Sequence, residues 1–309
     1  MRVIVSTLLC LTLASAAVAQ PAAAPVRQTL VHDDIARGYY VVEPPAAADT
    51  ALVPLVLVLH GGGGNGLNAI EMTGFDRKAV EEGFIAVFPE GTGRTTLLTW
   101  NADHCCAYAM TEEVDDIGFI GALLDELLRS YPVDPTRIYV TGISNGAMMT
   151  HRIAIAMPDR IAAIAPVVGA LFGDEPRPTG PVPAIIINGA DDAVIPYAGG
   201  PPPRAEGGLL FANAWDGTEL RPSRYQGTFW LLANGCAGLV PPPIEAPAYT
   251  LWTYDCPAGA DIEFYLVRDN GHAWPGGRAG RAGGDVPTAA FDATDVIWDF
   301  FNRHALADR

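Results

Sequence analysis

The sequence predicts an α/β protein with a doubly wound, mostly parallel sheet. Short apolar runs bounded by glycine or proline alternate along the chain with longer segments whose apolar residues recur at helical spacing. This alternation is typical of strand–helix–strand units, in which the strands run parallel and helices cover both faces of the sheet. Near the middle of the chain, the apolar run Ile138–Thr141 leads directly into Gly142-Ile-Ser-Asn-Gly146 and then into a helix-compatible segment.

The predicted strands are nearly continuous apolar runs, as expected for strands that are buried on both faces. Val53–His60 is the clearest, because every residue between its proline and its histidine is valine or leucine. Gly38–Glu43 is predicted to be an edge strand. The other predicted strands are Phe84–Phe88, Ile138–Thr141, Ile161–Val168, Val182–Asn188 and Asp261–Arg268.

The predicted helices carry their apolar residues on one side. In Glu112–Tyr131, the residues Ile117, Ile120, Leu124 and Leu127 recur every three or four positions, which predicts an amphipathic helix packed on the core. The other predicted helices are Leu67–Glu82, Ala147–Met157 and Pro287–His304.

The alternation breaks between about residues 197 and 260, a region that holds Pro201–Pro203, Pro241–Pro243 and many glycines. We interpret this region as a loop-rich insertion over the carboxyl ends of the strands, where sheets of this kind bind their ligands.

The first residues have the pattern of a secretory signal peptide. Arg2 supplies a positive start, Val3–Leu13 an apolar stretch, and Ala17-Val-Ala19 a small-residue cleavage site. We therefore predict a signal peptide over residues 1–19, a flexible leader over 20–36 and one catalytic domain over 37–309. The protein is expected to be secreted or periplasmic. No later stretch reaches the ~18 apolar residues that a transmembrane helix needs.

The net charge of −16 argues against nucleic acid and anionic membranes as partners, because both are negatively charged. An acidic surface fits an exported enzyme with a neutral substrate.

Four cysteines remain once Cys10 leaves with the signal peptide, and an even number in an exported chain suggests disulfides. We favour a Cys236–Cys256 bridge, which closes a loop in the irregular region and contributes about 3 kcal/mol. Cys105 and Cys106 are then either a vicinal bridge or two free thiols. No metal site is predicted, because His104-Cys-Cys lacks further ligands at zinc-like spacing.

The sharp turn around Ser144 predicts a nucleophilic serine. A strand that meets a helix through Gly-x-Ser-x-Gly lifts the serine hydroxyl above the sheet, and the glycines let the strand and the helix approach each other. The Asn145 N–H then lies at a helix N-terminus, where a developing oxyanion is stabilised.

A serine nucleophile needs a base and a carboxylate that orients the base. Of the six histidines, His272 alone follows a predicted strand in a loop C-terminal to Ser144. For the acid, the loop after the strand that ends at Asn188 offers Asp191 and Asp192, which spacing does not separate. The second oxyanion donor is predicted to be the N–H of Gly62, in the glycine run that follows Val53–His60.

Six motifs occur together in order along the chain. They are Leu59-His-Gly-Gly-Gly-Gly, Trp100-Asn with Cys105-Cys, Val114-Asp-Asp-Ile-Gly-Phe, Gly142-Ile-Ser-Asn-Gly-Ala-Met, Val194-Ile-Pro-Tyr-x-Gly-Gly and Gly271-His-x-Trp-Pro-Gly. Together they resemble the polyhydroxybutyrate depolymerase/feruloyl esterase family of secreted α/β-hydrolases over about residues 37–304. The resemblance implies that Asp192 is the acid. Asn188 stands where this family usually has histidine, a difference expected to alter the rim of the pocket.

The resemblance implies an exported serine esterase with a Ser144–His272–Asp192 triad and no metal or organic cofactor. The expected substrates are polyhydroxybutyrate oligomers or polymer, with feruloylated or acetylated plant polysaccharide as the alternative. Trp100 and Trp274 are either substrate-binding residues beside the pocket or packing residues. A non-catalytic polymer-binding protein and a peptidase are the other classes considered. The complete order of serine, acid and histidine argues against the first, and the lack of a propeller-like second domain argues against the second.

Overall fold

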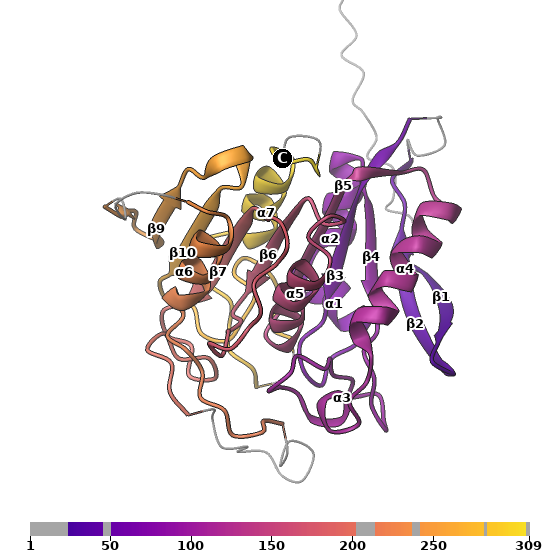
Figure 1. The fold of residues 1–309 in the computed structure, drawn as a ribbon, viewed down its shortest axis with the longest axis horizontal. Coiled ribbons are helices and arrows are strands. Elements are labelled where there is room, and N and C mark those ends of the chain that lie inside the picture. Colours follow the sequence, from indigo (N-terminus) through magenta and orange to yellow (C-terminus); the bar gives the residue numbers. More distant parts are fainter. Residues whose placement is uncertain (1–23, 46–50, 202–213, 237–241, 281–282, 307–309) are drawn as a thin grey trace, which may run out of the picture.

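One ten-stranded sheet forms the centre of the molecule, in the strand order β1-β2-β4-β3-β5-β6-β7-β10-β9-β8 (Figure 1). The computed structural model describes residues 24–45, 51–201, 214–236, 242–280 and 283–306. The predicted signal peptide, residues 1–19, lies outside the described residues. In the described part of the chain, no helix combines the length and the apolar character required to cross a bilayer.

The middle of the sheet is parallel and both of its edges are antiparallel. Strands β4, β3, β5, β6, β7 and β10 run parallel, whereas β1 and β2 on one side and β9 and β8 on the other pair antiparallel. The strands are β1 Val26–His32, β2 Ile35–Val42, β3 Val53–Leu59, β4 Ile85–Pro89, β5 Val133–Ile143, β6 Ala163–Val167, β7 Ala184–Gly189, β8 Ile244–Glu245, β9 Tyr249–Tyr254 and β10 Ile262–Val267.

Helices cover both faces of the sheet. They are α1 Gly66–Thr73, α2 Phe75–Glu82, α3 Ala107–Thr111, α4 Asp116–Ser130, α5 Asn145–Ala156, α6 Arg224–Ala233 and α7 Ala293–Phe301, with a 3₁₀ helix at Pro257–Gly259. This is the doubly wound α/β architecture that the sequence predicts.

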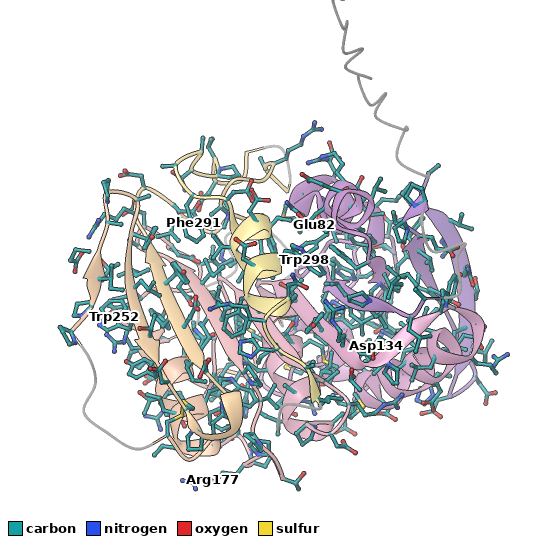
Figure 2. The ribbon with its side chains drawn as sticks, turned by 90° about the horizontal axis from the view of Figure 1, so that it is seen from above. Glu82, Asp134, Arg177, Trp252, Phe291 and Trp298 are labelled. Atoms are coloured by element: carbon teal, nitrogen blue, oxygen red, sulfur yellow. A yellow bond between two sulfur atoms is a disulfide. The ribbon has the colours of Figure 1, made fainter. Side chains whose placement is uncertain are left out.

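The core divides into two apolar layers, one on each side of the sheet. Successive side chains of β3 alternate between them, with Val56 and Val58 in one layer and Leu55 and Leu57 in the other. Helices α1, α2 and α7 pack on the first layer, and α4, α5 and α6 on the second. Figure 2 shows α7, which carries Trp298, beside α2, which ends at Glu82.

The predicted flexible leader is wrong for residues 26–36, which form β1, a two-residue turn and the start of β2. Val26–His32 pairs residue by residue with residues 35–41, which include the start of the first strand that the sequence predicts, and this pairing satisfies the backbone N–H and C=O groups that face β2. Gly38–Glu43 is consequently not an edge strand, because β2 lies between β1 and β4. The signal that could have found β1 is weak, since its side chains are mostly exposed or half-buried.

Two predicted helices differ in detail from the observed ones. The segment Leu67–Glu82 forms two helices, because the backbone of Gly74 has φ 69°, a left-handed conformation that ends one helix before the next begins. The predicted helix from Glu112 begins at Asp116, since the side chain of Asp115 caps it by accepting a hydrogen bond from the Gly118 N–H.

The region 197–260 is only partly an insertion of loops, and residues 202–213 and 237–241 of it lie outside the described residues. Helix α6 packs beside β10, and β9 pairs with β10 along its whole length. The prediction of a loop-rich insertion over the strand ends is therefore wrong for this part, which extends the sheet instead. Its proline clusters flank regular elements and concealed them in the sequence.

The structure pairs Cys236 with Cys256 in a disulfide and joins Cys105 to Cys106 in a second one. Cys256 follows β9 at Tyr254, which pairs with Ile262, the first residue of β10. The Cys236–Cys256 bridge thus lies at the amino ends of the parallel strands. The bridge closes a loop in the irregular region, as the sequence predicts, but it does not lie over the carboxyl ends of the strands.

Replacing Cys236 and Cys256 together by serine is expected to lower the melting temperature by several degrees. The bridge restricts the unfolded chain over a 20-residue separation and contributes about 3 kcal/mol. Turnover of a small ester at low temperature should stay within about twofold, since the bridge is remote from the carboxyl ends of the strands. Peptide mapping without reduction checks the pairing, and a peptide that links Cys236 to Cys105 or Cys106 would contradict it.

Candidate active site

The turn between β5 and α5 places Ser144 in a backbone conformation that residues other than glycine rarely adopt, with φ 58° and ψ −121°. The flanking glycines are required by close contacts. A Cβ on Gly142 would lie 2.6 Å from the Gly146 carbonyl oxygen, and a Cβ on Gly146 would lie 2.4 Å from that of His60. The local sequence therefore permits a strained turn that presents the serine side chain beyond the sheet, as the Gly-x-Ser-x-Gly spacing predicts.

Three predicted residues from three loops form one hydrogen-bonded chain. His272 Nε2 is 2.8 Å from Ser144 Oγ, and His272 Nδ1 is 2.8 Å from Asp192 Oδ2. Ser144 follows β5, Asp192 follows β7 and His272 follows β10. These strands are parallel, so the loops after them meet at the same edge of the sheet.

Burial separates the two adjacent aspartates. The Asp192 side chain is fully buried, and its Oδ1 accepts hydrogen bonds from the Val194 and Ile195 N–H groups at 2.8 and 2.7 Å. This leaves Oδ2 directed at His272. Asp191, by contrast, is exposed. The geometry agrees with the choice of Asp192 that the family resemblance implied.

The loop that carries His272 is held by two residues that the sequence analysis missed. Asn270 is fully buried, and its side chain donates to the Gly271 and Ala273 carbonyls and accepts from the Thr288 N–H. Asp285 accepts a 2.6 Å hydrogen bond from the His272 N–H. The sequence could have indicated Asn270, because it is a polar residue in the loop that follows a strand. No local sequence pattern connects Asp285 to His272, which lies 13 residues earlier.

Two backbone N–H groups point to an oxyanion site beside Ser144. In the described part of the chain, neither the Gly62 N–H nor the Asn145 N–H has a protein acceptor. A Cβ on Gly62 would lie 3.6 Å from the Asn145 Cβ, so the two loops are in contact. Asn145 is the first residue of α5, where the helix dipole favours negative charge.

His60 shapes the glycine loop through hydrogen bonds of both its ring nitrogens. Burial lowers the pKa of His60 to about 4, so its imidazole is neutral near pH 7. Its Nε2 accepts from the Gly91 N–H at 2.9 Å, and its Nδ1 therefore carries the proton donated to the Gly61 carbonyl at 2.8 Å.

Trp100 and Trp274 are packing residues, which is the second of the two alternatives that the sequence left open, and substrate binding by their side chains is not supported. Both side chains are fully buried. The Trp100 indole N–H donates to the His60 carbonyl, and that of Trp274 donates to Thr294 Oγ1. Both rings pack against residues distant in sequence, Trp100 beside His60 and Trp274 beside Phe75.

Asn188 is also fully buried. It therefore does not itself line a pocket rim, although its departure from the family pattern had suggested an effect there. It accepts from Gln226 Nε2 at 3.2 Å, and Gln226 Oε1 lies 2.8 Å from His151 Nε2. Burial lowers the pKa of His151 to about 4. Its Nδ1 accepts from the Trp230 indole N–H at 3.0 Å, so the neutral ring donates from Nε2 to Gln226.

Acid is expected to destabilise the fold through these two histidines. Their folded-state pKa values of about 4 lie below the ordinary value of 6.5, so between these pH values the unfolded chain binds protons that the folded chain does not. The free energy of unfolding should therefore fall as pH drops from 6.5 to 4, by about 1.4 kcal/mol per pH unit for each histidine. For His151→Gln, the free energy of unfolding measured in urea should depend on pH with a slope smaller by about 1.4 kcal/mol per pH unit. An unchanged slope would contradict the assignment of His151 as neutral.

The site can carry out nucleophilic chemistry with protein groups alone. A neutral imidazole at hydrogen-bond distance can take the proton of Ser144, and the carboxylate of Asp192 stabilises the imidazolium. Among the described residues, His32, Asp33 and Asp115 are close enough together to hold a metal ion, and they share no member with this site.

Two solved structures with a similar fold carry esterase names. An acetyl xylan esterase from Aspergillus awamori superposes with a TM-score of 0.57 at 16% identity, covering 90% of this chain and 99% of that one. Esterase PE8 superposes with a TM-score of 0.52 at 16% identity, covering 84% and 95%. These similarities show an α/β-hydrolase fold.

Proteins with related sequences carry esterase names. NocK of Nocardia uniformis subsp. tsuyamanensis, which is provisionally named an esterase, is 30% identical over 72% of this chain. Feruloyl esterase B of Piromyces equi is 27% identical over 74%, and a poly(3-hydroxybutyrate) depolymerase of Ralstonia pickettii is 30% identical over 57%. The match spans 66% of NocK and 38% of each of the other two proteins.

The family model described as esterase PHB depolymerase matches residues 37–182, which include the glycine loop and the turn at Ser144. The α/β-hydrolase fold and the related sequences agree with this match. The chain belongs to the esterase PHB depolymerase family.

Proposed function

We propose that this protein is a serine esterase that hydrolyses carboxylic esters through Ser144, His272 and Asp192. The observation that carries the proposal is the continuous chain of hydrogen bonds from Asp192 through His272 to Ser144, with each contact at 2.8 Å. The unpaired N–H groups beside the serine support it, because acyl transfer requires donors for an oxyanion.

The reaction proceeds in two half-reactions. Ser144 Oγ attacks the ester carbonyl while His272 Nε2 accepts the hydroxyl proton, and the Gly62 and Asn145 N–H groups stabilise the resulting oxyanion. As the bond to the alcohol oxygen breaks, His272 returns the proton to that oxygen. Water then loses a proton to His272 and attacks the acyl-enzyme. As the bond from the acyl carbon to Ser144 Oγ breaks, His272 returns that proton to Ser144 Oγ, and the acid is released. Asp192 remains a carboxylate throughout and stabilises the imidazolium.

The proposed substrates are polyhydroxybutyrate oligomers or polymer, with feruloylated or acetylated plant polysaccharide as the alternative. The names of the relatives support both, since they include a poly(3-hydroxybutyrate) depolymerase, feruloyl esterases and an acetylxylan esterase. Polymers do not cross membranes, so the proposal includes export directed by residues 1–19. Mass spectrometry of the N-terminus of exported protein tests that part, and an intact Met1 would contradict it.

A hydrolysis panel tests the proposed function. The purified protein is assayed on hydroxybutyrate oligomers, methyl ferulate, acetylated xylan and p-nitrophenyl acetate, with the Ser144→Ala variant as background. The highest kcat/KM is expected on the hydroxybutyrate oligomers. A preference for methyl ferulate or acetylated xylan would select the alternative substrate class. If no ester were hydrolysed above background, the proposed esterase function would be refuted.

A further inference from the structure

Trp100 links the two loops that supply the proposed oxyanion donors. It lies on neither loop, and its side chain is fully buried. Its backbone bonds the side chain of Asn145, which follows Ser144, and its indole bonds the carbonyl of His60, which precedes the glycine loop. One residue therefore contacts both halves of the oxyanion site.

The contact with Asn145 is reciprocal. The Trp100 N–H donates to Asn145 Oδ1 at 2.8 Å, and Asn145 Nδ2 donates to the Trp100 carbonyl at 2.9 Å. One bond needs the amide oxygen and the other needs the amide nitrogen, so a single orientation of the Asn145 side chain satisfies both. This pair holds the residue whose own backbone N–H faces the oxyanion.

The contact with the glycine loop comes from the indole ring. Its N–H donates to the His60 carbonyl at 3.0 Å, two residues before Gly62. The ring centroids of Trp100 and His60 lie 5.0 Å apart, and His60 in turn donates to the Gly61 carbonyl. The position of the Gly62 N–H relative to the Asn145 N–H is thus set through Trp100.

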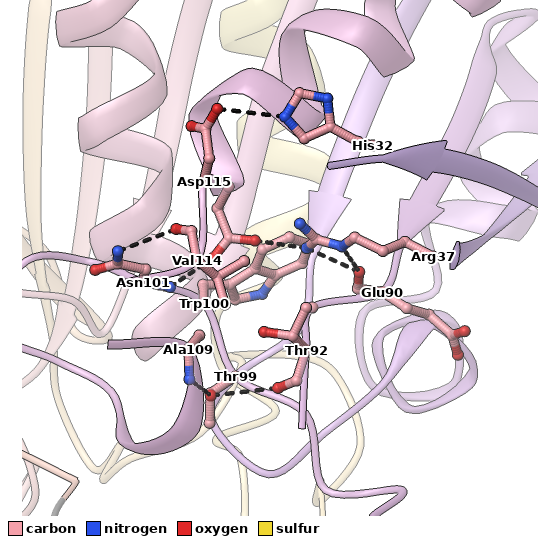
Figure 3. A network of polar contacts seen from close by, with 12 residues as sticks. His32, Arg37, Glu90, Thr92, Thr99, Trp100, Asn101, Ala109, Val114 and Asp115 are labelled. Atoms are coloured by element: carbon pink, nitrogen blue, oxygen red, sulfur yellow. Dashed lines mark hydrogen bonds and ion pairs between the residues drawn. The ribbon is translucent and has the colours of Figure 1, made fainter. Parts of the chain in front are cut away.

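A buried ion pair supports the residue that follows Trp100, in the polar network in which Figure 3 labels Arg37, Trp100 and Asn101. The Asn101 N–H donates to Asp116 Oδ2 at 2.6 Å, and Asp116 Oδ1 lies 2.6 Å from Arg37 NH2. The Arg37 guanidinium carbon lies 3.7 Å from the centroid of the Phe119 ring and 5.3 Å from that of Trp100. Both charged side chains are almost completely buried, so breaking this support would leave an uncompensated charge.

We propose that Trp100 is a positioning residue that sets the spacing of the two oxyanion donors. The inference rests on the proposed esterase function. Trp100 does not touch the substrate. It acts through Asn145 and His60, and so it contributes where negative charge develops on the substrate oxygen. Because that charge exists in the transition state and not in the bound ester, loss of the indole N–H should lower kcat and leave KM nearly unchanged.

The test compares Trp100→Phe with Trp230→Phe. Both tryptophans are fully buried, and each indole N–H bonds a histidine, but Trp230 bonds the ring of His151 away from the glycine loop. Deleting an oxyanion donor costs about 10²–10³-fold in kcat, so displacing one is expected to cost about 10–100-fold. Trp100→Phe should show this loss on p-nitrophenyl acetate with KM within about twofold, whereas kcat of Trp230→Phe should stay within about twofold.

A trifluoromethyl ketone provides a second readout, because its adduct with serine carries an oxyanion. Its affinity should fall in Trp100→Phe by about the same factor as kcat. Equal kcat and equal inhibitor affinity in the two phenylalanine variants would overturn the inference. If Trp100→Phe does not melt cooperatively, Asn145→Ala carries the test, since it keeps the backbone N–H, adds no charge and removes both hydrogen bonds to Trp100. Full kcat in that variant would likewise overturn the inference.

The two proposals fail in different ways. Activity that survives in Ser144→Ala would refute the esterase mechanism itself. An inactive Ser144→Ala with a fully active Trp100→Phe would leave the mechanism standing and refute the role of Trp100 alone.

Discussion

Replacing Ser144 by alanine is expected to lower ester hydrolysis by at least about 10⁴-fold. The substitution removes the proposed nucleophile and leaves His272 and Asp192 without a hydroxyl to deprotonate, whereas the turn itself keeps both of its glycines. Steady-state kinetics on p-nitrophenyl acetate and on hydroxybutyrate oligomers measure the loss, and thermal melting checks the fold. The melting temperature should change little, because alanine keeps the Cβ and therefore the same backbone conformation that Ser144 occupies.

Ser130→Ala is the matched control for this variant. Ser130 is exposed at the end of α4, and its hydroxyl donates to Glu126. The ester hydrolysis activity of Ser130→Ala should equal that of the unmodified protein. If Ser144→Ala retained a tenth of the original kcat/KM, the assignment of Ser144 as the nucleophile would be wrong.

Replacing Asp192 by asparagine is expected to lower kcat by about 10⁴-fold. Asparagine can still accept from the Val194 and Ile195 N–H groups through its oxygen, so the loop keeps its shape. Its NH₂ group then faces His272 Nδ1 and favours the tautomer with the proton on Nε2. An imidazole in that state cannot accept the proton of Ser144.

Asp191→Asn removes the same charge one residue earlier and is the control. Its side chain is exposed, so kcat should change by less than about threefold. Kinetics of the two variants under identical conditions decide between the aspartates, and the reverse ranking would show that Asp191 orients the base.

Features encoded in a few adjacent residues could be predicted from the sequence. The turn at Ser144 was among them, because only glycine fits where Gly146 meets the end of β3. The position of His272 in a loop after a strand was another. The parallel centre of the sheet followed from buried runs such as β3, whose composition reflects burial on both faces.

Features that depend on pairing between distant segments could not be predicted in the same way. Strand β1 is stabilised by its hydrogen bonds to β2 and has little apolar pattern of its own. Likewise, α6 and β9 join the sheet although prolines surround them in the sequence. In each case, the energy that stabilises the element comes from the neighbour on which it packs.

The sequence by itself determined the nucleophile turn, the candidate base and the doubly wound α/β class, because these depend on local backbone freedom and on the period of apolar residues. The tertiary structure decided which adjacent aspartate faces His272, since burial distinguishes two chemically identical side chains. It also decided that Trp100 is enclosed by residues from other segments, among them Arg37, rather than exposed to substrate. Burial is a property of the whole packed chain, and a local pattern does not contain it.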